Sequence, residues 1–227
     1  MIVTIRPEPG GGATVAAGQA LGLEIECCPL SAIRPVDWSL PRGRFDGLLL
    51  GSANALRHGG PLVDKLVEKP VYAVGQATAA AARERDFSLA RIGDGGMQAL
   101  LGSLSGERLR LLRIAGRERV PVTPPPGVAV ETVTAYESVL MALPAEFAPR
   151  LGQGSIVLLH SAAAARHFAA ECERLAVQRG AIRLAALGSR IAEAAGAGWG
   201  EVRFAAEPNE VALLALARDM CHEPPSR

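Results

Sequence analysis

Four turns in the sequence have the residue types that bind anions without using a charged side chain. Each places a small residue between a short apolar run and an Ala-rich stretch: Ser52, Gly75, Ser161 and Gly188. Where a strand ends and a helix begins at once, the first N–H groups of the helix and its partial positive charge are exposed. Small residues leave this backbone uncovered, so a carboxylate or phosphate can approach it closely. For each turn taken alone, an ordinary helix cap or a tight turn is the competing interpretation.

Three arginines near a later apolar run are further candidates for binding an anion. Arg113, Arg117 and Arg119 flank Gly116 just after this run. A guanidinium group binds carboxylates through several N–H donors in a fixed geometry. Simple surface charge is the alternative for Arg113 and Arg117.

The sequence contains no familiar catalytic motif. Gly10-Gly11-Gly12 follows an apolar run but lacks the spacing of a dinucleotide-binding loop. His160 and Ser161 are adjacent, so on a strand their side chains point to opposite sides and cannot form a nucleophile–base pair. There is no G-x-S-x-G and no Walker motif. The sequence therefore predicts turns that bind anions, without an evident reactive group.

Composition and charge exclude several classes of protein. The chain has 227 residues, of which 49% are hydrophobic and 4% aromatic, so a large aliphatic core is expected. The net charge of +1 gives no general reason to bind nucleic acid or an anionic membrane. The N-terminus lacks the pattern of a signal peptide, and no apolar run is long enough to span a membrane. We expect a cytoplasmic location.

The cysteines and histidines do not predict a metal site. Cys27, Cys28, Cys172 and Cys221 include no C-x-x-C pair, and the histidines are not at ligand spacing from them. Reduced, incidental thiols are the simplest interpretation. No metal and no cofactor are expected.

Apolar runs alternate with Ala-rich stretches along the chain, which is typical of parallel sheets in α/β proteins. The predicted strands are 2–6, 23–27, 45–50, 71–74, 88–92, 109–114, 128–136, 156–159, 183–187 and 202–205. The predicted helices are 13–21 after a turn at Gly10–Gly12, 52–66, 75–85, one after each of strands 156–159 and 183–187, and 209–220. Asn209 or the residue before it is expected to cap the last helix.

An internal repeat indicates two similar lobes. The order strand, Ser, Ala-rich helix, strand, Gly, Ala-rich helix occurs once from Phe45 and again from Ser155. Ser52 corresponds to Ser161, and Gly75 corresponds to Gly188. Two α/β lobes would create a cleft in which repeated turns could hold a polyanion.

Several short motifs occur in order along more than 200 residues. They are Val3-Thr4-Ile5-Arg6-Pro7, Gly22-Leu23-Glu24 to Pro29-Leu30, Phe45-Asp46 to Gly51-Ser52-Ala53-Asn54-Ala55, Val71 to Gly75 with Thr78-Ala79, Leu112-Arg113 to Gly116-Arg117-Glu118, Val133-Thr134-Ala135-Tyr136, and Ser161 with Leu187-Gly188 and Ala192. In these motifs and their spacing, the chain resembles the uroporphyrinogen-III synthase family. Gly51 and Ile191 depart from the resemblance, since the family usually has Thr there. Pro121 and Pro124–Pro126 replace a segment that is usually helical, so an irregular crossover is expected.

The resemblance implies a fold and a reaction. The fold is α/β with two similar lobes, each a flavodoxin- or Rossmann-like parallel sheet flanked by helices. One discontinuous domain would contain residues 1–34 and 138–227, the other residues 37–134, with extended linkers at 33–37 and 134–139. The reaction is cyclisation of linear hydroxymethylbilane to uroporphyrinogen III, with loss of water and inversion of ring D, through a spiro intermediate. No cofactor or metal is implied.

The resemblance also implies which residues contact the substrate, a linear tetrapyrrole with eight carboxylates. They are Arg6, Ser52, Ala53, Asn54, Gly75, Thr78, Arg113, Gly116, Arg117, Ser161 and Gly188. Tyr136 is the candidate for the acid that assists loss of the hydroxyl group, and a packed linker tyrosine is the alternative. A monomer is expected, and a transient contact with hydroxymethylbilane synthase, the upstream enzyme, is left open.

Two other functions compete with the synthase. A non-enzymatic two-lobed protein that binds an organic polyanion would have similar architecture, but such proteins are usually exported. A nucleotide-sugar transferase would have paired Rossmann-like domains, but that class is usually longer and carries a diphosphate signature.

Overall fold

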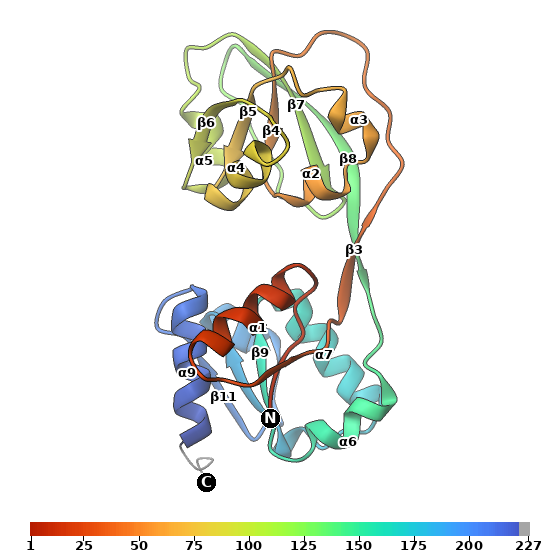
Figure 1. Ribbon diagram of the computed structural model, residues 1–227, viewed down its shortest axis with the longest axis vertical. Helices are drawn as coiled ribbons and strands as arrows, with labels where there is room; N and C mark the ends of the chain where they lie inside the picture. Colours follow the sequence, from red (N-terminus) through yellow and green to blue (C-terminus); the bar gives the residue numbers. More distant parts are fainter. Residues whose placement is uncertain (223–227) are drawn as a thin grey trace. The chain divides into compact units, whose positions relative to one another are not determined.

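The computed structural model of the protein describes residues 1–222, and the chain divides into two compact units. Unit 1 contains Met1–Ala32 and Val139–Arg227, and unit 2 contains Ile33–Ser138. The last residues of the first expected domain, 223–227, lie outside the described part. The chain passes between the units twice, within strands β3 (Ser31–Pro35) and β8 (Val128–Leu140) (Figure 1).

Unit 1 is built on a five-stranded sheet in the order β11-β10-β9-β1-β2, and its strand pairs are parallel. The strands are β1 (Ile2–Thr4), β2 (Ile25–Cys27), β9 (Ile156–Leu159), β10 (Arg183–Ala186) and β11 (Glu201–Phe204). The helices are α1 (Gly10–Ala20), α6 (Ala148–Leu151), α7 (Ala162–Arg174), α8 (Ser189–Ala194) and α9 (Glu210–His222), with 3₁₀ turns at Ala145–Phe147 and Arg179–Ala181.

Helices cover both faces of this sheet because its strands are apolar on both sides. Along β1, Ile2 packs with residues of α1 and α9, whereas the next residue, Val3, packs with α7 and α8. The alternation follows from the period of two residues along a strand. Asn209 caps α9, since its Oδ1 accepts a hydrogen bond of 2.9 Å from the Ala212 N–H, which confirms the expected cap.

Unit 2 is built on a six-stranded sheet in the order β3-β8-β7-β4-β5-β6. The further strands are β4 (Gly47–Leu50), β5 (Val71–Val74), β6 (Leu89–Gly93) and β7 (Leu109–Gly116), and the pairs from β8 to β6 are parallel. The helices are α2 (Asn54–His58), α3 (Pro61–Asp64), α4 (Gln76–Arg83) and α5 (Gly96–Gly102). The first three pack on one face and α5 on the other (Figure 1). Both units thus confirm the expected α/β class with largely parallel sheets.

Three local expectations were wrong. Gly10–Gly12 is the first turn of α1 rather than a loop. The helix expected over 52–66 is two short helices, because Gly60 has a positive φ of 69° and Pro61 begins a new helix. Helix α5 was not expected at all. The crossover 117–127 between β7 and β8 contains no helix, as its prolines predicted.

Three of the four cysteines are shielded from solvent to some degree, and all four are free thiols. Burial and the neighbouring Glu8 raise the pKa of Cys27 to about 11, and burial raises the pKa of Cys172 to about 12. Cys221 is exposed. Within residues 1–222, no helix has both the length and the apolar character needed to span a membrane.

Candidate functional site

A pocket of about 290 Å³ lies at the carboxyl ends of β4, β5 and β7 in unit 2. Open parallel sheets bind ligands at this edge, where loops leave the strands. Its walls include five residues that the sequence singled out: Ser52, Arg113, Gly116, Arg119 and Tyr136. The fold therefore brings together residues that are separated by more than 80 positions in the sequence.

Arg113 is a buried cation without a carboxylate partner among residues 1–222. Its exposed fraction is 6%, and its Nη2 donates a hydrogen bond of 3.1 Å to the Val120 carbonyl. Its Nε is buried and has no hydrogen-bond partner. Burial lowers the pKa of Arg113, and the nearby charge of Arg119 lowers it further. A buried charge is costly unless it is paired, so an anion that entered the pocket and paired with this guanidinium would lower that cost.

The alternation of β7 explains why an arginine lies inside the unit. Leu112 and Ile114 point into the core under α4, and Leu111 points into the core under α5. Arg113 is on the same face of the sheet as Leu111 but lies nearer the carboxyl end of β7. At that end it borders the pocket together with Met97, in the first turn of α5. The result is a polar position at the margin of an apolar layer.

A second pocket, of about 520 Å³, also borders Arg113 and is lined by the helix-free crossover. Arg117 and Arg119 border it, together with Val120 and Pro121. Arg117 is paired with Glu137, with 2.6 Å between Nε and Oε2. Arg119 donates from Nη1 to uncharged oxygens, 2.9 Å from Thr134 Oγ1 and 3.0 Å from the Gly116 carbonyl. The first pocket is lined by two arginines, Arg113 and Arg119, and by one acidic residue, Glu118, so its formal charge is positive.

Tyr136 lies against Gly116 on the neighbouring strand. A Cβ atom at Gly116 would lie 2.7 Å from Cε2 of the tyrosine ring, so only glycine leaves room for it. In the described part of the chain, the Tyr136 hydroxyl makes no hydrogen bond, and Tyr136 lines the same pocket as Arg113. The phenol is therefore free to bind a ligand.

The remaining predicted residues of unit 2 contribute mainly backbone. Ser52 Oγ accepts a hydrogen bond of 3.2 Å from the Asn54 N–H, and α2 begins at Asn54 rather than at Ser52. Gly75 has a φ of 76° and is the N-cap residue just before α4. Ala53 and Thr78 are buried, so the structure does not bring their side chains to the pocket. Gly51, where the family usually has Thr, lies beside Met97: a Cβ atom there would be 2.8 Å from Met97 Cε.

In unit 1, two predicted residues lie at the starts of helices. Ser161 caps α7, and its Oγ accepts a hydrogen bond of 3.1 Å from the Ala164 N–H. Gly188 precedes α8 and borders a pocket of about 670 Å³ with Arg166, Arg190 and the exposed Phe204. The capping role that competed with anion binding is therefore present at Ser161.

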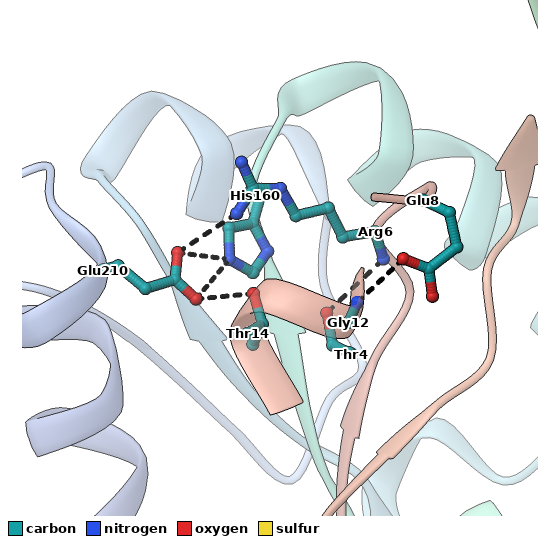
Figure 2. Close-up of polar contacts among 7 residues, drawn as sticks. All are labelled: Thr4, Arg6, Glu8, Gly12, Thr14, His160 and Glu210. Atoms are coloured by element: carbon teal, nitrogen blue, oxygen red, sulfur yellow. Dashed lines mark hydrogen bonds and ion pairs between the residues drawn. The ribbon is translucent and has the colours of Figure 1, made fainter. Parts of the chain in front are cut away.

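Sequence reasoning missed a polar cluster around Glu210 in unit 1 (Figure 2). Thr14 Oγ1 donates to Glu210 Oε1 at 2.6 Å, Arg6 Nη1 lies 3.3 Å from Oε2, and His160 Nε2 lies 3.1 Å from Oε2. Burial alone would raise the pKa of Glu210, but the hydrogen bonds from His160 and Thr14 and the charge of Arg6 outweigh it and hold this pKa below its ordinary value. Thr14 and Glu210 are 196 positions apart, so no local pattern could have joined them.

Comparisons with known proteins place the chain in a family. Residues 12–215 match the family model described as uroporphyrinogen-III synthase HemD. A crystal structure of uroporphyrinogen-III synthetase from Helicobacter pylori is similar, with a TM-score of 0.67 and 18% identity over 96% of this chain and 98% of that one. A mutant uroporphyrinogen III synthase from the extremely thermophilic bacterium Thermus thermophilus aligns over 98% of this chain and 99% of that one, with 18% identity and a TM-score of 0.48. No curated protein sequence matches the chain.

Proposed function

The chain belongs to the uroporphyrinogen-III synthase family, and from that premise we propose that the Arg113 pocket of unit 2 binds a carboxylate of the substrate. The protein is a cyclising lyase of tetrapyrrole biosynthesis that acts on hydroxymethylbilane. This linear substrate carries acetate and propionate side chains, which are the anions that a buried guanidinium would select.

The observation that carries the proposal is that Arg113 lines the pocket as a buried charge with no carboxylate partner within residues 1–222. A carboxylate in the pocket that accepts from a terminal nitrogen of Arg113 would neutralise this charge. The pocket's volume of about 290 Å³ suits one acid side chain or one ring rather than a whole tetrapyrrole.

The enzyme must control which isomer forms more than it must accelerate the loss of water. Loss of the terminal hydroxyl as water leaves an azafulvene cation, and unguided closure gives the symmetric isomer. A preference of about 99:1 for the type III isomer requires only about 2.7 kcal/mol between the two transition states. Holding one carboxylate at Arg113 restricts the orientation of the ring that bears it, which is a contribution of this size.

Tyr136 is the proposed acid. Its hydroxyl proton passes to the departing hydroxyl group, the carbon–oxygen bond breaks, and water leaves. The cation Arg113 lines the same pocket as the phenolate that remains. The proton that ring closure later releases can return to Tyr136, so the residue is restored.

Further contacts are proposed for turns that expose backbone N–H groups or small side chains. They are Ser52, Ala53, Asn54, Gly75, Thr78, Gly116 and Arg117 in unit 2, and Arg6, Ser161 and Gly188 in unit 1. Ala53 and Thr78 would contribute through backbone, because their side chains are buried. We also infer a monomer that acts in the cytoplasm and receives its unstable substrate from the upstream synthase; the free cysteines suit a reducing compartment.

The function is tested by incubating the protein with freshly generated hydroxymethylbilane and separating the product isomers. We expect the type III isomer. A product mixture equal to the control without enzyme would refute the synthase and leave a binding protein for an organic polyanion.

The role of Tyr136 is tested with Tyr136→Phe, which removes only the hydroxyl group. We expect kcat to fall about 10²-fold, the lower end of what a general acid contributes, while the melting temperature is retained. Tyr72, the other tyrosine of the chain, lies in the core under α5, and Tyr72→Phe is the matched control with unchanged kcat. An unchanged kcat in Tyr136→Phe would make Tyr136 a packing residue.

A further inference from the structure

The polar cluster of unit 1 lies at the position where the sheet's connections reverse direction. In the order β11-β10-β9-β1-β2, the chain leaves β1 toward β2 on one side and leaves β9 toward β10 on the other. Arg6 follows β1 and His160 follows β9, so both side chains come from this central pair. In open α/β sheets, ligands bind outside the carboxyl ends of the strands at such a point.

Arg6 keeps donors that no residue in the described part of the chain uses. Its Nη1 contacts Glu210, whereas its Nε and Nη2 have no hydrogen-bond partner within residues 1–222. The side chain is 39% exposed, so these donors are accessible to a ligand. The guanidinium lies against the start of α1, where a Cβ atom at Gly10 would come within 2.4 Å of Nε. Glycine at this position therefore makes room for the arginine.

The start of the helix next to Arg6 is already occupied. Glu8 accepts a hydrogen bond of 2.9 Å from the Gly12 N–H and so takes the beginning of α1. A ligand that approaches the end of β1 therefore meets Arg6 as its charged donor. An Nε and a terminal nitrogen of one guanidinium match the two oxygens of a carboxylate.

Glu210 is held more tightly than a simple ion pair requires. Its carboxylate accepts from Thr14 of α1 and contacts His160 after β9, in addition to Arg6 after β1 (Figure 2). The His160 side chain is 10% exposed, and its Nδ1 is buried without a hydrogen-bond partner. A buried imidazole that leaves one nitrogen unsatisfied is costly, so its contact with Glu210 requires a reason beyond packing.

We propose that Glu210 is a positioning residue that fixes Arg6 so that its Nε and Nη2 bind a second carboxylate of the substrate. His160 and Thr14 set the orientation of the Glu210 carboxylate, and Glu210 in turn fixes the guanidinium. An unrestrained arginine would lose rotamer freedom on binding, whereas a prearranged one has already lost it. The inference rests on the proposed function, since it assumes a substrate that carries several carboxylates.

The test is a double-mutant cycle with Glu210→Gln and Arg6→Gln, measured on freshly generated hydroxymethylbilane. We expect each single variant to raise KM about tenfold with kcat within about twofold, and the double variant to be no worse than Arg6→Gln alone. Glu26→Gln is the matched control, because Glu26 is also paired with an arginine of unit 1, Arg150, and should leave KM unchanged.

The outcomes separate the inference from the proposed function. If Glu210→Gln raises KM by the same factor in the wild-type and the Arg6→Gln backgrounds, Glu210 does not act through Arg6. If Glu210→Gln lowers the melting temperature and leaves KM unchanged, Glu210 only stabilises the fold. Either result overturns the positioning role. If Arg6→Gln has the wild-type KM, Arg6 does not bind the substrate and the inference is wrong, although the Arg113 pocket is untouched. Only loss of type III product by the wild-type protein would refute the synthase itself.

A second variant keeps the test decisive if Glu210→Gln does not fold. Glu210→Asp retains the charge but shortens the side chain, so the carboxylate no longer meets Arg6 at 3.3 Å. We expect a severalfold rise in KM at a near-normal melting temperature. A wild-type KM for folded Glu210→Asp would overturn the positioning role.

Discussion

Replacing Arg113 with methionine should stabilise the fold and weaken substrate binding at the same time. Methionine has a similar length and no polar group to satisfy. Removing the unpartnered, buried Nε of a charged group relieves a cost above about 3 kcal/mol, and losing the charge-assisted hydrogen bond to the Val120 carbonyl costs about 1.5–3 kcal/mol. The free energy of unfolding should therefore rise by about 1 kcal/mol.

The same substitution removes a charged donor from the pocket. A hydrogen bond to a charged group is worth about 1.5–3 kcal/mol, which corresponds to an increase in KM of about 10- to 150-fold. The share of type I product should also rise, because the ring held by this contact gains freedom. Stability is measured by urea unfolding, and KM and isomer ratio with freshly generated hydroxymethylbilane.

Arg110→Met is the matched control on the same strand. Arg110 is exposed and paired with Glu131 at 2.9 Å, so its loss should change stability by less than about 1 kcal/mol and leave KM unchanged. If Arg113→Met lowers the free energy of unfolding by more than about 1 kcal/mol and keeps the wild-type KM, Arg113 is a structural residue and the reasoning from its unpaired charge is refuted.

Three further predictions concern unit 1. The pKa of Glu210 is lower in the folded protein, so its contribution to stability is present above the unfolded pKa of 4.5 and is lost as the pH falls through the lower folded pKa. Between about pH 5 and about pH 3, the free energy of unfolding measured with urea should therefore fall less for Glu210→Gln than for the wild type. An equal fall in both proteins would contradict this. Ser161→Ala should lower the free energy of unfolding by about 1 kcal/mol through loss of the α7 cap, and Ser161→Asp should restore it; a thermal melt that does not distinguish Ala from Asp would exclude the cap. A thiol reagent at about pH 8 should modify exposed Cys221 first, since pKa values of about 11 and about 12 keep Cys27 and Cys172 protonated; peptide mapping that finds Cys172 modified first would show that its burial is not maintained.

The sequence predicted the fold class and several strands because buried parallel strands are continuous apolar runs. Val71–Val74 and Ile156–Leu159 begin and end where expected. Errors arose where tertiary contacts override local preference. Gly10 belongs to α1 although glycine disfavours a helix, and the Arg6 side chain occupies the space that a Cβ atom would fill. Helix α5 escaped notice because it starts and ends with glycine.

The candidate site was predictable only in part, for a related reason. Arg113 and Gly116 share one strand, so their spacing already indicated a common place at its carboxyl end. Nothing in the sequence indicates that Arg113 would lack a partner, since that depends on which side chains surround it. The cluster around Glu210 was out of reach, because its members come from elements joined only by folding.

The helix-free crossover 117–127 forms part of the wall of the Arg113 pocket, whereas the sheet forms the scaffold beneath it. Strands β7 and β8 pair over their own length, and the crossover is fastened to α5 by two hydrogen bonds between the Gln98 amide group and the Thr123 backbone. Residues such as Val120 and Pro121 can therefore be exchanged without shifting the register of any strand. Exchanges in this segment should therefore change the lining of the two pockets beside Arg113, while the sheet below it remains the same.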